Sequence, residues 1–530
     1  MSSSSPILFH GGKVHTVDAF RPSATWFTTV GRRFQQVGSG ELPRASRRVD
    51  LKGQTVVPGF VDAHIHFFQT GIDALHIDVS GVRSLKELQE VLRDMAPKGQ
   101  RTWVFANSFE EDNLQDIELL NRHHLDEAFA ERPVWVNRVD YHSAVVNTLA
   151  LKRLEIPPGT HGMLKGPDGK PDGILRASAY IYSKARVSRY YSIEIKDKAV
   201  KAAVQACLPK GITAVHALEG GDVFGDEGVH AVLRKMNTIP LDLSLFLQEK
   251  DIFLTNRLGF EHLGGCILVD GSIGSYTAAL NENYEGFDNL RGILYERWRA
   301  LSSFVSKAHR AGVQLAFHAI GPRAIQMVLD AYAKAMRKTP RYDHRHRIEH
   351  FELATDEQIR QAAELGVIAS MQPAFEWYWG GPAGMYAARL GERWRNTNRF
   401  RSMLDAGVVI AGGSDANVTP PDPLLGMHAA VNHANHHERI DPARALRMMT
   451  LDSAYAAFTE KRQGSITPGK EASFVVLEED PMTIDSSRLK DIRVMETWIK
   501  GKPVWRREED AEMGISRERH QPILLDEKKR

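Results

Sequence analysis

The chain has 530 residues, of which 42% are hydrophobic and 25% charged, a composition typical of a soluble globular protein with a large core and accessory modules. Its 68 basic and 66 acidic residues give a formal charge of +2, so the charge balance does not favour nucleic acid or an acidic membrane surface as a partner. Two cysteines exclude a disulfide framework, and neither a secretory signal nor a long apolar run is visible, so we expect a cytoplasmic protein with no membrane span.

Both ends of the chain carry the pattern of a small antiparallel sheet. Residues 6–55 alternate short apolar runs with glycine and polar turns, and the pattern returns in ASFVVL and VMETWIKGKPVW. We therefore expect residues 1–55 and 463–507 to form one composite β-sandwich. The charged tail, residues 508–530, is expected to be frayed or to lie on the surface.

The body of the chain alternates apolar strands with helical patterns such as RAIQMVLDAYAKAM. This alternation predicts an α/β fold, a (β/α)8 barrel of the TIM type, over residues 56–70 and 206–462. Its eight parallel strands are expected at 56–64, 211–218, 241–247, 266–271, 313–318, 346–350, 367–372 and 408–415.

The connection between the first two of these strands is far longer than the others. Residues 71–205 contain strand patterns of their own, TWVFANSF and RPVWVNRVD, and helical segments such as SLKELQEVLRDM. We interpret this segment as an inserted α/β lid above the C-terminal mouth of the barrel, because the loops at that face build the sites of barrel enzymes.

Histidine and aspartate side chains end several of the predicted strands. His64 and His66 close the first strand, and residues i and i+2 of a strand face the same side, so both imidazoles can converge on one ion. His318, His350 and Asp415 end three later strands, and a closed barrel gathers these ends at one mouth. Nitrogen and carboxylate ligands suit zinc, and a zinc site with one open position makes a bound water nucleophilic near neutral pH.

Several stretches occur in the order of a known family: GFVDAHIH, DYHSAVVNTLAL, VDGSIGSYTAAL, FHAIGPRAIQMVLDA, HRIEHFE and GGSDANVTPPDPLLG. By these stretches the chain resembles the metal-dependent amidohydrolase superfamily, and within it the amidohydrolase-3 branch, which includes N-substituted formamide deformylase-like proteins. The resemblance extends from about residue 6 to about residue 505. It implies a metal-dependent enzyme that acts on carbon–nitrogen bonds other than peptide bonds.

One residue departs from the family pattern. Members of the branch usually carry a lysine four residues before the aspartate of the VDGS segment, and its carboxylated side chain bridges two metals. Cys266 stands there in this chain. Because a cysteine side chain is much shorter, we expect its sulfur to fall several Å short of the ions and Cys266 to be a buried apolar residue rather than a ligand.

A substitute bridge is available in Glu219, which closes the second strand near the position where related D-aminoacylase-like enzymes place a metal-binding cysteine. The alternative for Glu219 is a solvated loop carboxylate. We expect one firmly bound zinc and leave a second divalent metal open.

Three further residues are candidates for contacting the substrate. His142 lies in the insert and matches a family segment, so it either contacts the substrate or tethers the lid. Asp270, in VDGS, is a substrate contact or part of a structural turn. Trp377, in the aromatic run FEWYWGG after the seventh strand, either lines an apolar pocket or packs within its loop.

The leading hypothesis is hydrolysis of a small-molecule amide or N-formyl compound by zinc-activated water. Zinc would be held by His64, His66 and His318, with His350 either as a fourth ligand or free of full ligation. Asp415 would be a further ligand or the general base that passes a proton to the leaving nitrogen. In a one-metal site, His350 would help to polarise the carbonyl. Two alternatives stay open: deamination of a cyclic amidine or nucleobase-like substrate, and a non-catalytic regulatory or ligand-binding barrel. The sequence leaves open whether the protein forms a homodimer.

Overall fold

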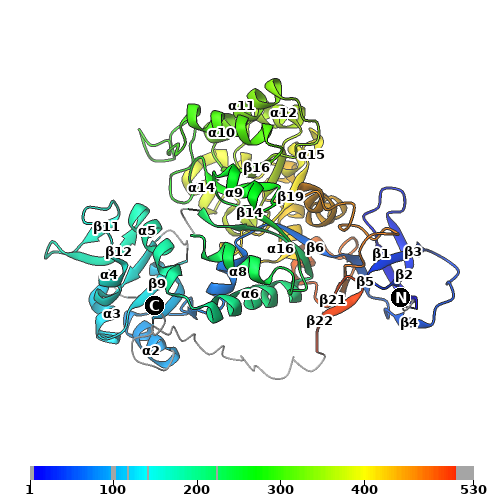
Figure 1. Ribbon diagram of the computed structural model, residues 1–530, viewed down its shortest axis with the longest axis horizontal. Coiled ribbons are helices and arrows are strands. Elements are labelled where there is room, and N and C mark those ends of the chain that lie inside the picture. Colours follow the sequence, from blue (N-terminus) through cyan, green and yellow to red (C-terminus); the bar gives the residue numbers. More distant parts are fainter. Residues whose placement is uncertain (1–4, 97–102, 116–118, 140–142, 222–224, 509–530) are drawn as a thin grey trace. The chain divides into compact units, whose positions relative to one another are not determined.

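The computed structural model describes residues 5–96, 103–115, 119–139, 143–221 and 225–508 (Figure 1). These residues belong to two compact units. One contains the residues up to His66, Gln205–Leu218 and the chain from Pro240, and the other contains Phe67–Val204 and Glu219–Ile239. Every helix in the described part of the chain falls short of the length and hydropathy needed to cross a lipid bilayer.

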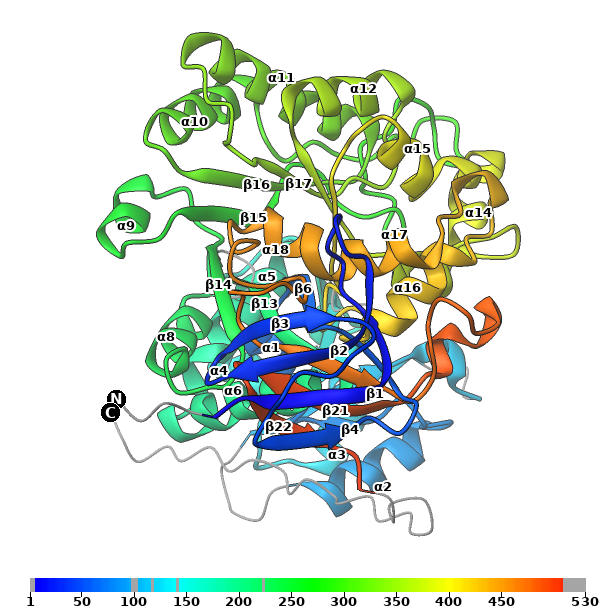
Figure 2. The same cartoon turned by 90° about the vertical axis from the view of Figure 1, so that its right-hand side faces the viewer.

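Strands from both termini join in one eight-stranded sheet. The strands are β1 (Ile7–His15), β2 (Ser23–Val30), β3 (Arg33–Gly38), β4 (Arg47–Asp50), β5 (Thr55–Pro58), β20 (Phe474–Leu477), β21 (Val494–Ile499) and β22 (Lys502–Arg506). Their order is β22-β21-β20-β5-β1-β2-β3, with β4 paired to β1. Figure 2 shows the blue N-terminal strands beside the red β21 and β22.

This sheet curls around an aromatic core. Phe27 on β2 and Phe474 on β20 lie three strands apart in the sheet order, yet their ring centroids are 5.0 Å apart. In a flat sheet, with about 4.8 Å between neighbouring strands, they would be about 14 Å apart. Strands from the two ends of the chain thus pair in one curled sheet, and the composite β-sandwich stays a prediction.

A second eight-stranded sheet forms a nearly closed parallel barrel. Its strands are β6 (Phe60–Ile65), β13 (Ile212–Glu219), β14 (Asp242–Leu247), β15 (His262–Leu268), β16 (Gln314–Ala319), β17 (Arg347–His350), β18 (Ile368–Met371) and β19 (Ile410–Gly412), arranged in chain order. A parallel bridge between Ile65, at the end of β6, and Ala416, just after β19, connects the last strand of the barrel to the first. The predicted α/β barrel is confirmed. The starts of two strands differ from the prediction by four residues: β6 begins at Phe60 instead of residue 56, and β15 begins at His262 instead of residue 266.

Helices between the strands pack against the barrel. α10 (Trp298–Arg310) and α11 (Pro322–Lys338) both contact β16, and α12 (Asp356–Leu365) follows β17. The buried residues of α11 recur every three or four positions, as in Ile325, Val328 and Leu329, which gives the helix one apolar face toward the strands.

The first predicted barrel strand, 56–64, divides at Gly59. A Cβ atom at this position would lie 2.1 Å from Oγ1 of Thr213, so only glycine allows the chain to pass there. The residues before Gly59 form β5, which pairs with β20 of the terminal sheet, and those after it form β6, which pairs with β13 of the barrel. The strand that carries His64 is thereby continuous with the terminal sheet.

The insert has a sheet and a core of its own. Six strands, β7 (Ile77–Asp78), β8 (Val104–Phe109), β9 (Val134–Arg138), β10 (Ser143–Val146), β11 (Met163–Lys165) and β12 (Pro171–Arg176), pair in the order β11-β12-β10-β9-β8-β7. Helices such as α2 (Leu85–Met95) and α5 (Ala177–Val187) complete an α/β unit. Its role as a lid stays a prediction. His142 and the tail from residue 509 lie outside the described residues.

Candidate metal centre

Five side chains from four parts of the barrel meet at the carboxyl ends of its strands. β6 carries His64 and His66, β16 carries His318, β17 ends at His350, and Asp415 follows β19. All five are buried. The ring of His350 lies 5.0 Å from that of His64 and 4.4 Å from that of His318, measured between centroids. The structure thus brings together five of the six candidate metal ligands named from the sequence, all except Glu219.

The carboxylate of Asp415 faces both histidines of β6. Its Oδ1 lies 3.2 Å from Nε2 of His64 and 3.2 Å from Nε2 of His66. Burial by itself would raise the pKa of Asp415, but the two histidines outweigh burial and hold this pKa well below its usual value. Asp415 is therefore ionised, which is the form that binds a cation or accepts a proton.

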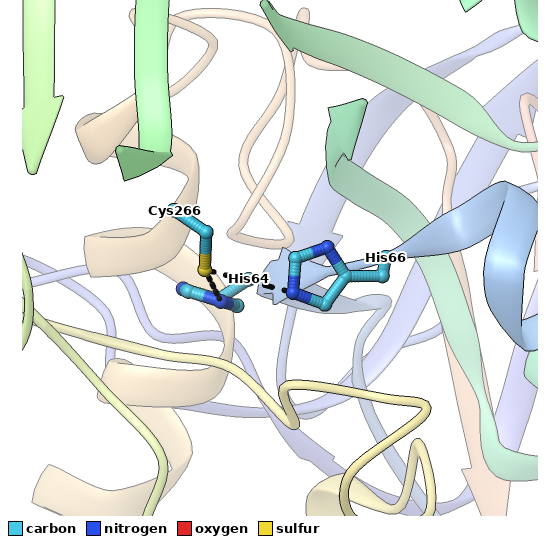
Figure 3. Close-up of side chains that lie close together, drawn as sticks. All are labelled: His64, His66 and Cys266. Carbon is cyan, nitrogen blue, oxygen red and sulfur yellow. Dashed lines mark hydrogen bonds between the residues drawn. The ribbon is translucent and has the colours of Figure 1, made fainter. Parts of the chain in front are cut away.

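Cys266 belongs to the same cluster (Figure 3). Its Sγ lies 3.6 Å from Nε2 of His64 and 3.6 Å from Nε2 of His66. It also forms a second group with His318 and His350, in which the potential ligand atoms all lie within 4.8 Å of one another. The expectation that this thiol would fall several Å short of a metal centre is wrong. Burial would raise the pKa of Cys266, but His66 and His64 lower it well below the usual value.

The backbone of β15 explains how a short side chain reaches the cluster. Gly264 and Gly265 precede Cys266 and have φ of +105° and +110°, a conformation that side chains rarely adopt. A Cβ at Gly264 would lie 1.9 Å from the carbonyl oxygen of Ala316, and one at Gly265 would lie 2.5 Å from Cδ2 of Leu218. The pairing of β15 with β16 is irregular at this point. The two glycines thus let this strand approach Ala316 and Leu218 closely, and this approach brings the short side chain of Cys266 to the cluster.

Hydrogen bonds orient the histidines. Nδ1 of His64 lies 2.6 Å from Oε2 of Glu349, and Nδ1 of His350 lies 2.6 Å from Oε1 of Gln372. An ionised carboxylate and an amide oxygen only accept, so Nδ1 donates in both rings and Nε2 is left with a lone pair. His318 has the opposite arrangement, because its Nε2 donates to the carbonyl of Gly271 at 3.3 Å. Its lone pair is therefore on Nδ1.

Two of these lone pairs have no hydrogen-bond partner. Within the described part of the chain, Nε2 of His350 and Nδ1 of His318 are buried and unpartnered. A buried polar atom without a partner is costly, and a cation bound by these two nitrogens would satisfy both of them. The donor set of imidazole nitrogen, carboxylate oxygen and thiolate sulfur is the one that zinc binds. The residues therefore fit a zinc centre.

Comparison with known proteins establishes the family. Residues 47–505 match the model of the amidohydrolase family. The chain belongs to this family. It is similar to YtcJ of Bacillus subtilis (strain 168), which is named as an amidohydrolase, with 28% identity over 94% of this chain and 99% of the relative. It is also similar to the N-substituted formamide deformylase of Arthrobacter pascens, with 26% identity over 94% of this chain and 98% of that protein.

A solved structure supports the same assignment. An uncharacterized metal-dependent hydrolase from Pyrococcus furiosus aligns with a TM-score of 0.74 and 25% identity, over 90% of this chain and 100% of that one. The protein is thus a metal-dependent hydrolase of the amidohydrolase superfamily that acts on carbon–nitrogen bonds, as its sequence predicted.

A buried ion pair supports the ligands of this amidohydrolase, and sequence reasoning missed it. Arg347 is fully buried and donates to both carboxylate oxygens of Glu349, at 2.8 and 2.9 Å. Glu349 in turn accepts from His64. Burial would raise the pKa of Glu349, but Arg347 and His64 hold it well below its usual value. Arg347 and Glu349, two charged residues at alternate positions of a buried strand, were the sequence signal that could have revealed this ion pair.

Asp270 and Glu219 have structural contacts within the amidohydrolase fold. The carboxylate of Asp270 accepts hydrogen bonds from the backbone N–H groups of Ala279, Ile320 and Gly321 at 2.8–3.0 Å, which suits the structural alternative. Oε1 of Glu219 accepts a hydrogen bond from the N–H of Phe68 at 2.7 Å. Substrate contact by Asp270 and metal binding by Glu219 stay predictions.

Phe375 packs against the candidate metal ligand His350, a contact that the sequence did not predict. Its ring stacks on His350 with centroids 6.1 Å apart, and Trp379 packs against it at 4.5 Å. Both lie on α13 (Ala374–Trp379), one turn apart. Trp377 instead packs against His428 and lies beneath the ammonium group of Lys490, with half of its surface exposed. Its role in substrate binding stays a prediction.

Removing the partner of His350 is expected to weaken metal binding without destroying the amidohydrolase site. Gln372→Leu leaves Nδ1 of His350 without its acceptor, so the ring loses a fixed orientation. Replacing such an outer partner costs about 10–100-fold in metal affinity. Zinc dissociation constants measured by competition with a chelating dye test this value. Gln326→Leu, on the outer helix α11, is the matched control and should not change the affinity; equal affinities in the two variants would contradict the role given to Gln372.

Proposed function

We propose that this amidohydrolase uses zinc to hydrolyse a small-molecule amide or N-formyl compound. The observation that carries the proposal is the convergence of His64, His66 and Asp415, in which Oδ1 of Asp415 lies 3.2 Å from Nε2 of each histidine. The substrate class is supported by the relative from Arthrobacter pascens, which is named for the deformylation of N-substituted formamides.

Four histidines would hold the metal, and one aspartate would transfer the proton. His64, His66, His318 and His350 present lone pairs that would hold the metal. When bound, zinc supplies a Lewis acid that polarises the substrate carbonyl and makes water nucleophilic near neutral pH. Asp415 takes the proton of the attacking water on its carboxylate and delivers it to the departing nitrogen. Its low pKa keeps this carboxylate ionised before the reaction begins.

His350 is better suited to bind metal than to donate a proton to a carbonyl. Its Nδ1–H is already donated to Gln372, so the neutral ring has no N–H left for a substrate oxygen. This supports ligation by His350 over the carbonyl-polarising role that a one-metal site would give it.

Hydrolysis of a panel of amides and N-substituted formamides by the zinc-loaded protein tests the proposed function. We expect a carboxylic acid and an amine in equal amounts from at least one compound, formate being the acid from a formamide. A parallel panel of cyclic amidines and nucleobases reports on deamination, which releases ammonia. Ammonia release from that second panel, with no amide cleaved, would contradict the proposal and favour a deaminase. A zinc-replete protein inert on both panels would favour a binding function.

A further inference from the structure

In the described part of the chain, Cys266 belongs to two of three groups of potential metal ligands, and the third group joins His64, His350 and Asp415. Of the two groups with Cys266, one pairs it with His64 and His66, and the other pairs it with His318 and His350. We propose that the Cys266 thiolate bridges two zinc ions, one held with the β6 histidines and one held with His318 and His350. The proposal deepens the zinc chemistry proposed above and rests on it. It replaces our expectation of one firmly bound zinc.

The spacing around the first position agrees with a tetrahedral ion. With Zn–S of about 2.3 Å and Zn–N of about 2.1 Å, a sulfur and a nitrogen on one tetrahedral zinc lie about 3.6 Å apart. The observed distances from Sγ of Cys266 to Nε2 of His64 and His66 are both 3.6 Å. Two ligands at about 2.1 Å lie about 3.4 Å apart by the same geometry, and Oδ1 of Asp415 lies 3.2 Å from each of these nitrogens. Sulfur and oxygen are therefore each spaced correctly from both nitrogens.

The second position depends on the two unpartnered lone pairs. Nε2 of His350 and Nδ1 of His318 are buried without a hydrogen-bond partner in the described part of the chain, and both rings are fixed at their other nitrogen. Sγ of Cys266 completes a set whose atoms lie within 4.8 Å of one another. An ion held by His64, His66 and Asp415 would leave the lone pairs of His318 and His350 without a partner. A second ion, held by these two histidines and the sulfur, would satisfy them.

The backbone holds the sulfur between the two groups. Gly264 and Gly265 allow β15 to approach β13 and β16, and the N–H of Cys266 donates to Oε1 of Gln248 at 3.0 Å. A thiolate is a soft ligand, so a thiolate bridge favours zinc or cobalt over magnesium or manganese. The chain would thus reach a two-metal centre with a short side chain on a closely packed strand.

Cobalt substitution tests the bridge independently of catalysis. We expect wild-type protein to bind about two cobalt ions per chain, as a two-metal site requires, and to show the near-ultraviolet thiolate-to-cobalt charge-transfer absorption. Cys266→Ala and Cys266→Ser should lose that absorption and retain at most one ion per chain. Cys207→Ala is the matched control, because Cys207 is the other cysteine and is buried in a different place. It should keep both signals. A Cys266→Ala protein with unchanged stoichiometry and spectrum would overturn the proposal.

A second measurement uses only the unaltered protein, in case the variants fail to fold. The metal-free and zinc-loaded forms are treated with iodoacetamide, and alkylation of each cysteine is followed by peptide mass spectrometry. Zinc should slow the alkylation of Cys266 at least tenfold and leave the buried Cys207 unreactive in both forms. Equal alkylation rates of Cys266 with and without zinc would refute ligation.

The outcomes separate this proposal from the proposed function. A cobalt spectrum with the thiolate band in a protein that cleaves no amide would leave the bridge standing and remove amide hydrolysis. Amide hydrolysis by a protein with one zinc and no thiolate band would leave the function standing and remove the bridge.

Discussion

The Asp415→Asn variant is expected to lose about two to four orders of magnitude of kcat while retaining most of its metal. The amide of asparagine keeps the size of the side chain and an oxygen near His64 and His66, but it cannot take a proton from water. Single-turnover kinetics on a substrate from the amide panel, together with zinc analysis of the same sample, measure both effects.

Asp422→Asn is the control for this variant. Asp422 lies on the same connection after β19 and caps α16 (Pro423–Val431), a role that asparagine performs equally well. It should therefore retain wild-type kcat. A zinc-replete Asp415→Asn enzyme with near-normal kcat would remove Asp415 from the role of general base.

The largest loss of stability is expected from Glu349→Ala. The change leaves the guanidinium of Arg347 buried and without its carboxylate, and unpairing a buried ion pair costs about 3–5 kcal/mol. It also removes the acceptor of His64, so metal affinity should fall as well. Urea unfolding of the metal-free protein measures the first effect without a contribution from metal binding, and a chelator competition measures the second.

Two further variants serve as controls for Glu349→Ala. Glu357→Ala breaks an exposed pair with Arg360 and should leave the urea concentration of unfolding nearly unchanged. Glu349→Gln keeps hydrogen-bond acceptors without the charge and should fall between the two. If Glu349→Ala unfolded at the same urea concentration as Glu357→Ala, the buried pair would not be the support that its contacts indicate.

The barrel and most of its ligands could be predicted because they depend on local patterns. Apolar strands alternate with helical segments, so the strand positions follow from periodicity. His64, His66, His318, His350 and Asp415 stand at strand ends, and the closure of a barrel brings such ends together whatever the details of packing. The composite terminal sheet followed from the same kind of pattern, whereas its curled, single-sheet pairing depends on contacts between Phe27 and Phe474 that no local pattern encodes.

The sequence was less informative at positions where the path of the backbone decides which side chains reach the site. Cys266 was judged by the length of its side chain, although the preceding Gly264–Gly265 pair was a visible sign that β15 leaves ordinary strand geometry. The role proposed for Trp377 in substrate binding stays a prediction, because an aromatic run does not show which side of a short helix faces the candidate metal centre. The phase of α13 turns Phe375 toward His350 and leaves Trp377 against Lys490. Glu349 was missed because it acts on a ligand rather than as one.

The division of one strand at Gly59 has a consequence for how the protein is made. β5 pairs with β20 along its whole length, from Thr55 opposite Leu477 to Pro58 opposite Phe474. A ribosome releases the chain from its N-terminus, so β5 waits for a partner more than four hundred residues away while His64 and His66 are already synthesised. A nascent chain that stops short of β20 contains every candidate ligand, yet β5, the strand that leads into His64 and His66, then has only β1 as a partner. We therefore expect the terminal sheet to be completed after every candidate ligand has left the ribosome.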